Sequence, residues 1–125
     1  MKDVSFHNNN QKLDIYQNDV IILKDVGLAK SYFSRLKGLM FKKEMPEDSG
    51  LLIVPCNEIH TFCMKFAIDA VYLDKNDCIV FIEKAIAPGK ICKLQRKAKK
   101  VLELCPNVSS KIGLAPGDKL TFEIN

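Results

Sequence analysis

Short apolar runs separated by turn-forming residues follow one another along most of this chain of 125 residues. The densest runs are Ile68–Leu73 and Cys78–Ile82, both of strand length. The segment Asp74–Asp77 between them reads Asp-Lys-Asn-Asp, a composition typical of tight turns. The pattern predicts an antiparallel hairpin in the middle of the protein.

Further strands are expected on the same grounds. Leu120–Ile124 alternates, so that Leu120, Phe122 and Ile124 would point inward and the residues between them outward. The segment Glu58–Phe66 also alternates between apolar and polar positions and is predicted to be extended. The other expected strands are Val4–Phe6, Val20–Leu23, Leu51–Val54 and Ala98–Leu104.

Helical spacing occurs mainly in one place. Apolar residues three and four positions apart in Leu28–Leu36 predict a helix that stops at Gly38. Arg35 and Lys37 would lie in its last turn, where cations complement the helix dipole. A second, short helix or turn is expected over Pro106–Ile112.

Many short strands with one main helix and one short helix favour a mostly β (α+β) fold. We expect a compact antiparallel β-barrel or sandwich of about six or seven short strands. The length of 125 residues is that of one domain, spanning 1–125.

Composition narrows the function classes only a little. The net charge of +4 permits an anionic partner without requiring one. No apolar run approaches the roughly 18 residues of a membrane helix, and the polar start does not resemble a signal peptide, so we expect a cytoplasmic protein without a transmembrane segment. The five cysteines form no CxxC pair, which predicts reduced thiols and neither a metal nor another cofactor.

Three blocks of sequence resemble a known family. They are Arg35–Met40, the long stretch from Gly50 to Asp74 that contains His60-Thr61-Phe62, and Val101–Leu104 with the later Gly117-Asp118. In order and spacing they are similar to the family called domain of unknown function 192, or uncharacterised protein family 0127, in its His-Thr-Phe branch, over about residues 29–122. The resemblance implies a β-barrel-like domain packed by a helix, and no established activity.

The chain departs from the family pattern at a few positions. Cys63 stands where the family usually has glycine, and Ala67 where it usually has proline. Pro106-Asn107 replaces an Ala-Gly pair, and Asn107 tolerates the left-handed backbone that glycine adopts readily.

Cys56, His60 and Cys63 are of the types that bind zinc or act as nucleophiles. On an extended strand His60 and Cys63 would point to opposite faces, and no second ligand pair follows. We therefore interpret these thiols as structural.

The candidate ligand-binding residues are His60, Thr61, Lys65 and Asp69, with Arg35 nearby. They interrupt the most apolar third of the chain, and a carboxylate such as Asp69 is rarely buried without partners. One reading is that they line a pocket. The alternative is structural, in which Asp69 pairs with Lys65 or Arg35, or accepts backbone N–H groups at a bend.

The segment Lys84–Lys100 contains seven basic residues and no acid. It contains no aromatic residue either, so we predict no specific nucleic-acid binding and interpret it as a solvated loop and strand face.

The sequence favours a non-catalytic binding module for a small polar ligand or an extended peptide. The alternatives are a small enzyme that uses His60 or Asp69 as acid or base, and a basic adaptor for an anionic partner. Whether the chain is an enzyme, which ligand it takes and its oligomeric state stay open at this level.

Overall fold

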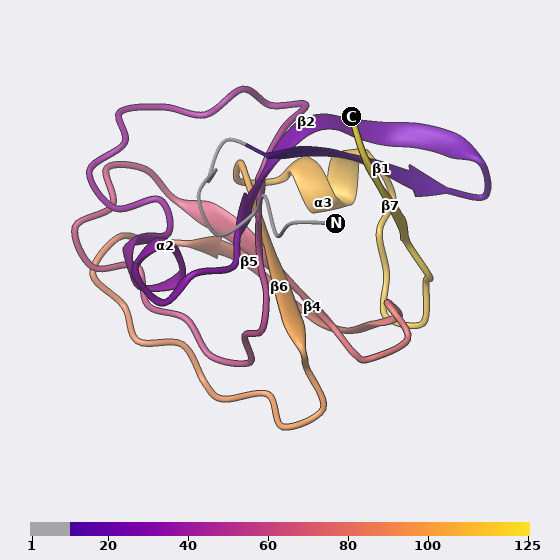
Figure 1. Cartoon of the computed structure of the whole chain (residues 1–125). Helices are drawn as coiled ribbons and strands as arrows, with labels where there is room; N and C mark the ends of the chain where they lie inside the picture. Colours follow the sequence, from indigo (N-terminus) through magenta and orange to yellow (C-terminus); the bar gives the residue numbers. More distant parts are fainter. Residues whose placement is uncertain (1–10) are drawn as a thin grey trace.

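One curved sheet of seven strands organises the protein (Figure 1). The computed structural model describes residues 11–125 and leaves the side chains of Tyr32 and Phe33 undescribed. In sheet order the strands are β5 (Ile79–Ile86), β4 (Ile68–Leu73), β6 (Lys100–Leu104), β3 (Leu51–Ile53), β2 (Val20–Ala29), β1 (Lys12–Gln17) and β7 (Thr121–Ile124). Two short helices accompany them, α2 (Tyr32–Lys37) and α3 (Val108–Lys111).

The strand pairs are antiparallel except for β2 and β3, which run parallel. The sheet bends so that its edges approach each other: the Gly117 N–H donates to the Ile79 carbonyl, and the Leu120 N–H donates to the Asp77 carbonyl. The mostly β fold class with one six-residue helix and one shorter helix is thus confirmed, in an incompletely closed, barrel-like form.

The central hairpin is confirmed. β4 and β5 pair antiparallel, and Asp74 closes the turn by accepting the backbone N–H groups of Asn76 and Cys78. Strands are also found at the expected positions of β3, β6 and β7, and α3 lies within the expected Pro106–Ile112. Asn107 has a φ of 72°, in the left-handed region that its glycine-like position suggested.

Other expectations were wrong. Glu58–Phe66 is not a strand but a looped segment, in which Cys63 has a φ of 60° and His60 makes an isolated bridge to Ile91. The left-handed residue breaks the alternation, so Thr61 and Met64 are buried while Phe62 and Cys63 are exposed.

Two boundaries and one strand also differ from expectation. β2 continues to Ala29, so the main helix begins only after Ser31, whose side chain caps it by accepting the Ser34 N–H. The strand β1 was not predicted. Ile124, expected to point inward, is exposed because it lies at the end of the edge strand β7. The expected strand Val4–Phe6 lies outside the described residues.

The core has two parts, one on each face of the sheet. Strand β4 is buried along its whole length, and its alternate side chains divide between the two clusters: Val71 and Leu73 join one, Ala70 and Tyr72 the other. The first cluster is covered by α3. The second is covered by the long loops that connect the strands.

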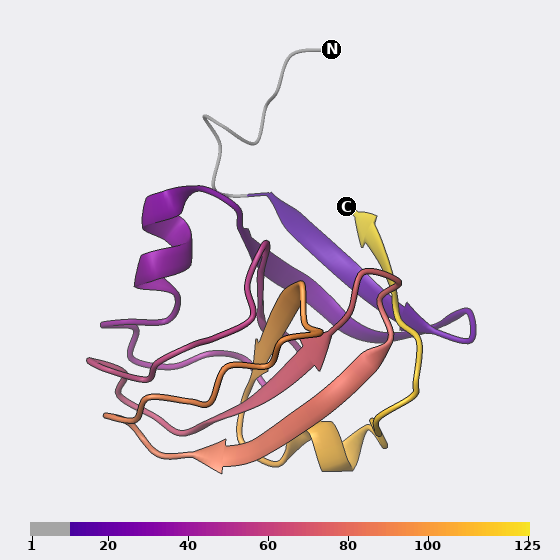
Figure 2. The ribbon, with the colours of Figure 1, turned by 90° about the horizontal axis from the view of Figure 1, so that it is seen from below.

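Three loops cover that second face as a single layer, which we call the loop layer: residues 30–45, 54–67 and 87–99. Backbone hydrogen bonds join them, from the Phe41 N–H to the Cys63 carbonyl and from the Cys92 N–H to the Ile59 carbonyl. Their tips gather at one end of the molecule, away from the β1–β2 turn (Figure 2). No helix within residues 11–125 is long and apolar enough to cross a membrane.

Candidate functional site

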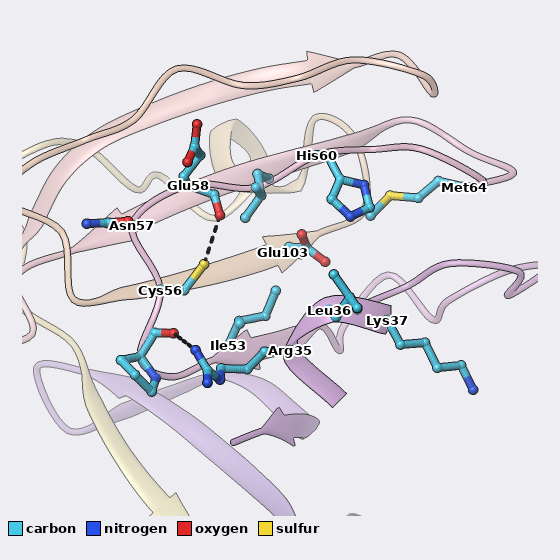
Figure 3. Close-up of a pocket in the computed structure, with 13 residues that line it drawn as sticks. Arg35, Leu36, Lys37, Ile53, Cys56, Asn57, Glu58, His60, Met64 and Glu103 are labelled. Carbon is cyan, nitrogen blue, oxygen red and sulfur yellow. Dashed lines mark hydrogen bonds between the residues drawn. The ribbon is translucent and has the colours of Figure 1, made fainter. Parts of the chain in front are cut away.

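A cavity of about 300 Å³ opens between α2 and the loop that follows β3 (Figure 3). The residues after the cis Val54–Pro55 peptide form one wall, and the last turn of α2 forms the other. The floor comes from the sheet, through Ile53 of β3 and Glu103 of β6. Polar side chains from three separate segments therefore meet in one place: Arg35 of α2, Cys56 and His60 of the loop after β3, and Glu103 of β6.

Glu103 is the most unusual of these side chains. It is only 1% exposed, and its Oε1 has no hydrogen-bond partner among the residues that the structure describes. Burial raises the pKa of the Glu103 carboxyl to about 8. The group is therefore largely a neutral carboxylic acid near pH 7, with a hydroxyl proton that it can donate.

The position of Glu103 follows from strand geometry. β6 is buried from Val101 onward, and alternation places Glu103 with Val101 on the face covered by the loop layer. Gly38 lies beside the carboxyl: a Cβ built there would be in ordinary contact with Oε1, at 3.7 Å. In Figure 3 the Glu103 carboxyl points into the space between His60 and Leu36.

Arg35 is one of the two basic residues that line the cavity, with Lys37. Its Nη1 donates to the Pro55 carbonyl at 3.2 Å, whereas its buried Nε has no partner within the described part of the chain. Arg35 and Pro55 also line a second cavity of about 290 Å³, together with Lys99. The guanidinium thus stands where two hollows meet.

His60 and Cys56 complete the wall. The Phe62 N–H donates to His60 Nδ1 at 3.1 Å, so the neutral ring carries its proton on Nε2, and the ring stacks on Phe62 at 5.2 Å. The Cys56 thiol donates to the Glu58 carbonyl, and burial raises the pKa of this thiol. Cys56 is accordingly a thiol rather than a reactive thiolate at neutral pH.

The structure brings together two of the five predicted binding residues. Arg35 and His60 line the cavity, and Thr61, Lys65 and Asp69 do not. Lys65 is exposed. Thr61 is buried and holds the loop layer together: its hydroxyl donates to the Ala87 carbonyl at 2.7 Å and accepts the Lys90 N–H at 2.8 Å.

Asp69 is buried and fully engaged elsewhere. One carboxyl oxygen accepts the backbone N–H groups of Ala85 and Asn107, and the other accepts the N–H and the hydroxyl of Ser109. These bonds tie β4 to the end of β5 and to the start of α3. This is the structural arrangement considered from the sequence, in which backbone N–H groups satisfy the carboxylate at a bend.

Glu103 was not identified from the sequence, although it lies in the family-like Leu-Glu-Leu stretch. In an alternating strand a glutamate between leucines normally faces solvent. The available signal was that Val101, Leu102 and Leu104 surround it, which indicates a strand buried on both faces.

All five cysteines are free, and Cys63 is exposed and is not among the residues that line the cavity. No group of three His, Cys, Asp or Glu side chains within residues 11–125 has the arrangement of a metal site.

The fold and cavity together define a small, mostly β domain with a buried acid in the floor of a pocket lined by polar and apolar side chains. The chain belongs to the domain of unknown function 192 family, described as an uncharacterized ACR, whose profile matches residues 14–122. The match begins within β1, and so starts earlier than the motif-bearing region near residue 29.

Individual relatives agree with this assignment. A UPF0127 protein from Pyrococcus horikoshii is 31% identical over 103 residues, covering 78% of this chain and 87% of that protein. A crystal structure of a protein of unknown function from Novosphingobium aromaticivorans superposes with a TM-score of 0.77 at 19% identity, over 88% of this chain and 83% of that one. The crystal structure of a proposed transcription regulator from Sinorhizobium meliloti also superposes with a TM-score of 0.77. Its identity is 23%, over 90% of this chain and 92% of that one. These two structures show the shared fold.

Proposed function

We propose that this protein is a non-catalytic binding module that holds a small polar ligand in the cavity between α2 and β6. The observation that carries the proposal is the buried carboxyl of Glu103, whose Oε1 lacks a partner among the described residues. Leaving such a group unpaired costs about 1–3 kcal/mol. A domain selected only for stability gains from an apolar residue at this position, whereas a bound ligand can supply the missing partner.

The chemistry of the wall favours an acidic ligand. The neutral Glu103 carboxyl, the Arg35 guanidinium and His60 Nε2 are all hydrogen-bond donors. Arg35 and Lys99 add positive charge on the side of Pro55. The ligand class that fits is a small organic acid, with its anionic group toward Arg35 and a carbonyl or ether oxygen toward Glu103. The cavity volume of about 300 Å³ supports a small molecule over an extended peptide.

A titration followed by NMR tests the proposal. The probes are acetate, succinate and benzoate, with the corresponding methyl esters as uncharged counterparts. We expect the acids to shift the amide signals of Gly38 and His60 in a saturable way, and the esters to bind at least ~tenfold more weakly because they lack the charge that Arg35 pairs with.

Two variants make the test specific to the cavity. Arg35→Gln should weaken binding of the acids, while Lys65→Gln, which removes an equal charge from an exposed position outside the cavity, should leave it unchanged. Binding that is the same in both variants, or signal changes confined to residues far from α2, would show that the cavity is not the site.

A small enzyme is the second candidate, because Glu103 has a pKa near neutrality and faces the same space as His60. Such a pair can serve in acid–base catalysis. The residues considered from the sequence were His60 and Asp69; in this arrangement Glu103 takes the place of Asp69. Glu103→Gln separates the two functions, because glutamine can still donate a hydrogen bond to a ligand but cannot transfer a proton.

A further inference from the structure

Charge is unevenly distributed over this protein. The loop layer contains eleven of the nineteen basic residues but only two of the fifteen acidic ones, Glu44 and Glu58. Ten of these basic residues are exposed: Lys30, Lys37, Lys42, Lys43, Lys65, Lys90, Lys93, Arg96, Lys97 and Lys99. The rest of the chain therefore has an excess of acidic residues. Although the net charge is only +4, the loop layer alone is strongly positive.

Exposed apolar side chains occur within the same layer. Leu36, Phe41, Phe62, Ile91 and Leu94 are five of the large hydrophobic residues with substantial solvent exposure, and Ile91 is 72% exposed. They come from all three loops. The backbone bond from the Phe41 N–H to the Cys63 carbonyl joins the first loop to the second, and the bridge between His60 and Ile91 joins the third loop to the second.

The layer is held in place by buried groups, so that it presents a defined surface. The side chain of Thr61 bonds to Ala87 and Lys90, and the Gln95 N–H donates to the Asn57 carbonyl. In Figures 1 and 2 the three loops lie side by side at one end, with the β1–β2 and β4–β5 turns at the other. Those turns contain Asp19, Asp74, Lys75 and Asp77, and Asp77 pairs with Lys100 of β6.

We propose that the loop layer docks on the surface of an anionic lipid bilayer. Lysines around exposed aliphatic and aromatic side chains match the headgroup boundary, where the cations pair with lipid phosphates and the apolar groups enter the outer acyl region. The excess of acidic residues in the rest of the chain gives the molecule a charge asymmetry that orients it as it approaches. Three of the five exposed apolar side chains in the loop layer, Leu36, Ile91 and Leu94, are aliphatic and offer no stacking surface for bases, so the mixture with Phe41 and Phe62 favours a bilayer over nucleic acid.

Sedimentation of the full chain with lipid vesicles tests the proposal. One set of vesicles contains phosphatidylcholine and phosphatidylglycerol in equal parts, and the other contains phosphatidylcholine alone. We expect binding to the first set only, weakening as salt rises. Loss of one lysine contact should lower the partition coefficient about fivefold, so that the charge reversal Lys93→Glu with Lys97→Glu lowers it at least ~tenfold.

The chain offers matched controls. Lys75→Glu with Lys119→Glu makes the same change in net charge at exposed positions outside the layer and should reduce binding far less. In the same way, Ile91→Ser with Leu94→Ser should release the protein from the vesicles, whereas Val20→Ser with Ile124→Ser, also exposed, should not. Equal losses in the paired variants, absence of vesicle binding, or binding only to polyuridylate RNA would each overturn the proposal.

Discussion

Two buried carboxyl groups lie almost side by side in this sheet and have opposite environments. Asp69 on β4 pairs with Leu104 in the register of β6, and its neighbour Ala70 pairs with Glu103. Strand alternation turns Asp69 toward the face covered by α3 and Glu103 toward the loop layer. Asp69 accepts four hydrogen bonds, while Oε1 of Glu103 receives none from the described residues.

The difference indicates what each region is for. A carboxylate that is fully bonded to backbone groups joins structural elements and has no capacity left for a ligand. A buried carboxyl that faces a cavity with a free oxygen contributes little to the fold and retains its capacity to bind. Burial of a charged residue alone does not distinguish the two cases, whereas the count of its partners does.

The largest expected effect is at Asp69. Asp69→Ala leaves three backbone N–H groups and the Ser109 hydroxyl without their acceptor, so we expect a loss of about 3–5 kcal/mol in the free energy of unfolding. Urea denaturation measures it. A loss under about 1 kcal/mol would mean that the contact between β4, the end of β5 and α3 is stable without the Asp69 carboxylate. The contrast with Glu103 would then disappear.

Glu103→Gln should raise the free energy of unfolding rather than lower it, and the size of the increase should depend on pH. The folded-state pKa of about 8 lies above the ordinary 4.5, so the folded protein holds this proton more tightly than the unfolded chain. The stability associated with the acid is complete below pH 4.5 and is lost as the pH rises toward 8.

Glutamine does not ionise, so the variant should match the wild type within about 1 kcal/mol at pH 5 and exceed its stability by about 2–4 kcal/mol at pH 8. Denaturation at the two pH values gives the difference. Lys75→Gln, at an exposed turn position, provides a control for general pH effects. A constant difference across this range would show that Glu103 does not change its ionisation on folding.

Ser109→Ala separates the contribution of the Ser109 hydroxyl from that of the backbone N–H groups that donate to Asp69. The hydroxyl bond of 2.6 Å disappears, but the Ser109 N–H and the other backbone donors keep their bonds to the carboxylate. We expect a loss of about 1–2 kcal/mol, clearly smaller than that of Asp69→Ala. If the two losses are equal, Asp69 acts mainly through Ser109, and the backbone bonds contribute little.

Prediction from the sequence succeeded where local signals were sufficient. The turn at Asp74–Asp77 and the apolar runs on either side define the β4–β5 hairpin without any distant contact. Glu58–Phe66 was mispredicted because its alternation resembles a strand, while the left-handed backbone at Cys63 and the bonds from Thr61 to Lys90 come from a loop far along the chain.

The candidate site was predicted in part for the same reason. Arg35 and His60 stood out as polar residues near apolar blocks, and both reached the cavity. Asp69 was the more conspicuous candidate in the sequence, but its carboxylate bonds to backbone groups that join β4, β5 and α3. Glu103 looked like an ordinary outward-facing residue, because its burial depends on three loops that cover the sheet from distant parts of the sequence. Which face becomes covered is a property of the tertiary structure, which strand periodicity alone does not contain.

The smallest expected effect concerns a second polar group on the Glu103 face. Tyr72 is fully buried, and its hydroxyl has no partner among the side chains and backbone groups that the structure describes. Burial raises the pKa of this phenol, so the hydroxyl stays protonated. Tyr72→Phe removes the unpaired hydroxyl and keeps the ring, including its contact with Phe81 at 5.8 Å between centroids. Because no bond is lost, we expect the free energy of unfolding to stay constant or rise by up to about 1 kcal/mol.

Chemical denaturation at pH 7 measures this change, and Tyr72→Leu is the control that removes the ring and should cost stability. A loss of about 1 kcal/mol or more in Tyr72→Phe would mean that the hydroxyl is bonded in solution, for instance through water. The face that contains Glu103 would then be satisfied like the face that contains Asp69, and unpaired polar groups would no longer set the two regions apart.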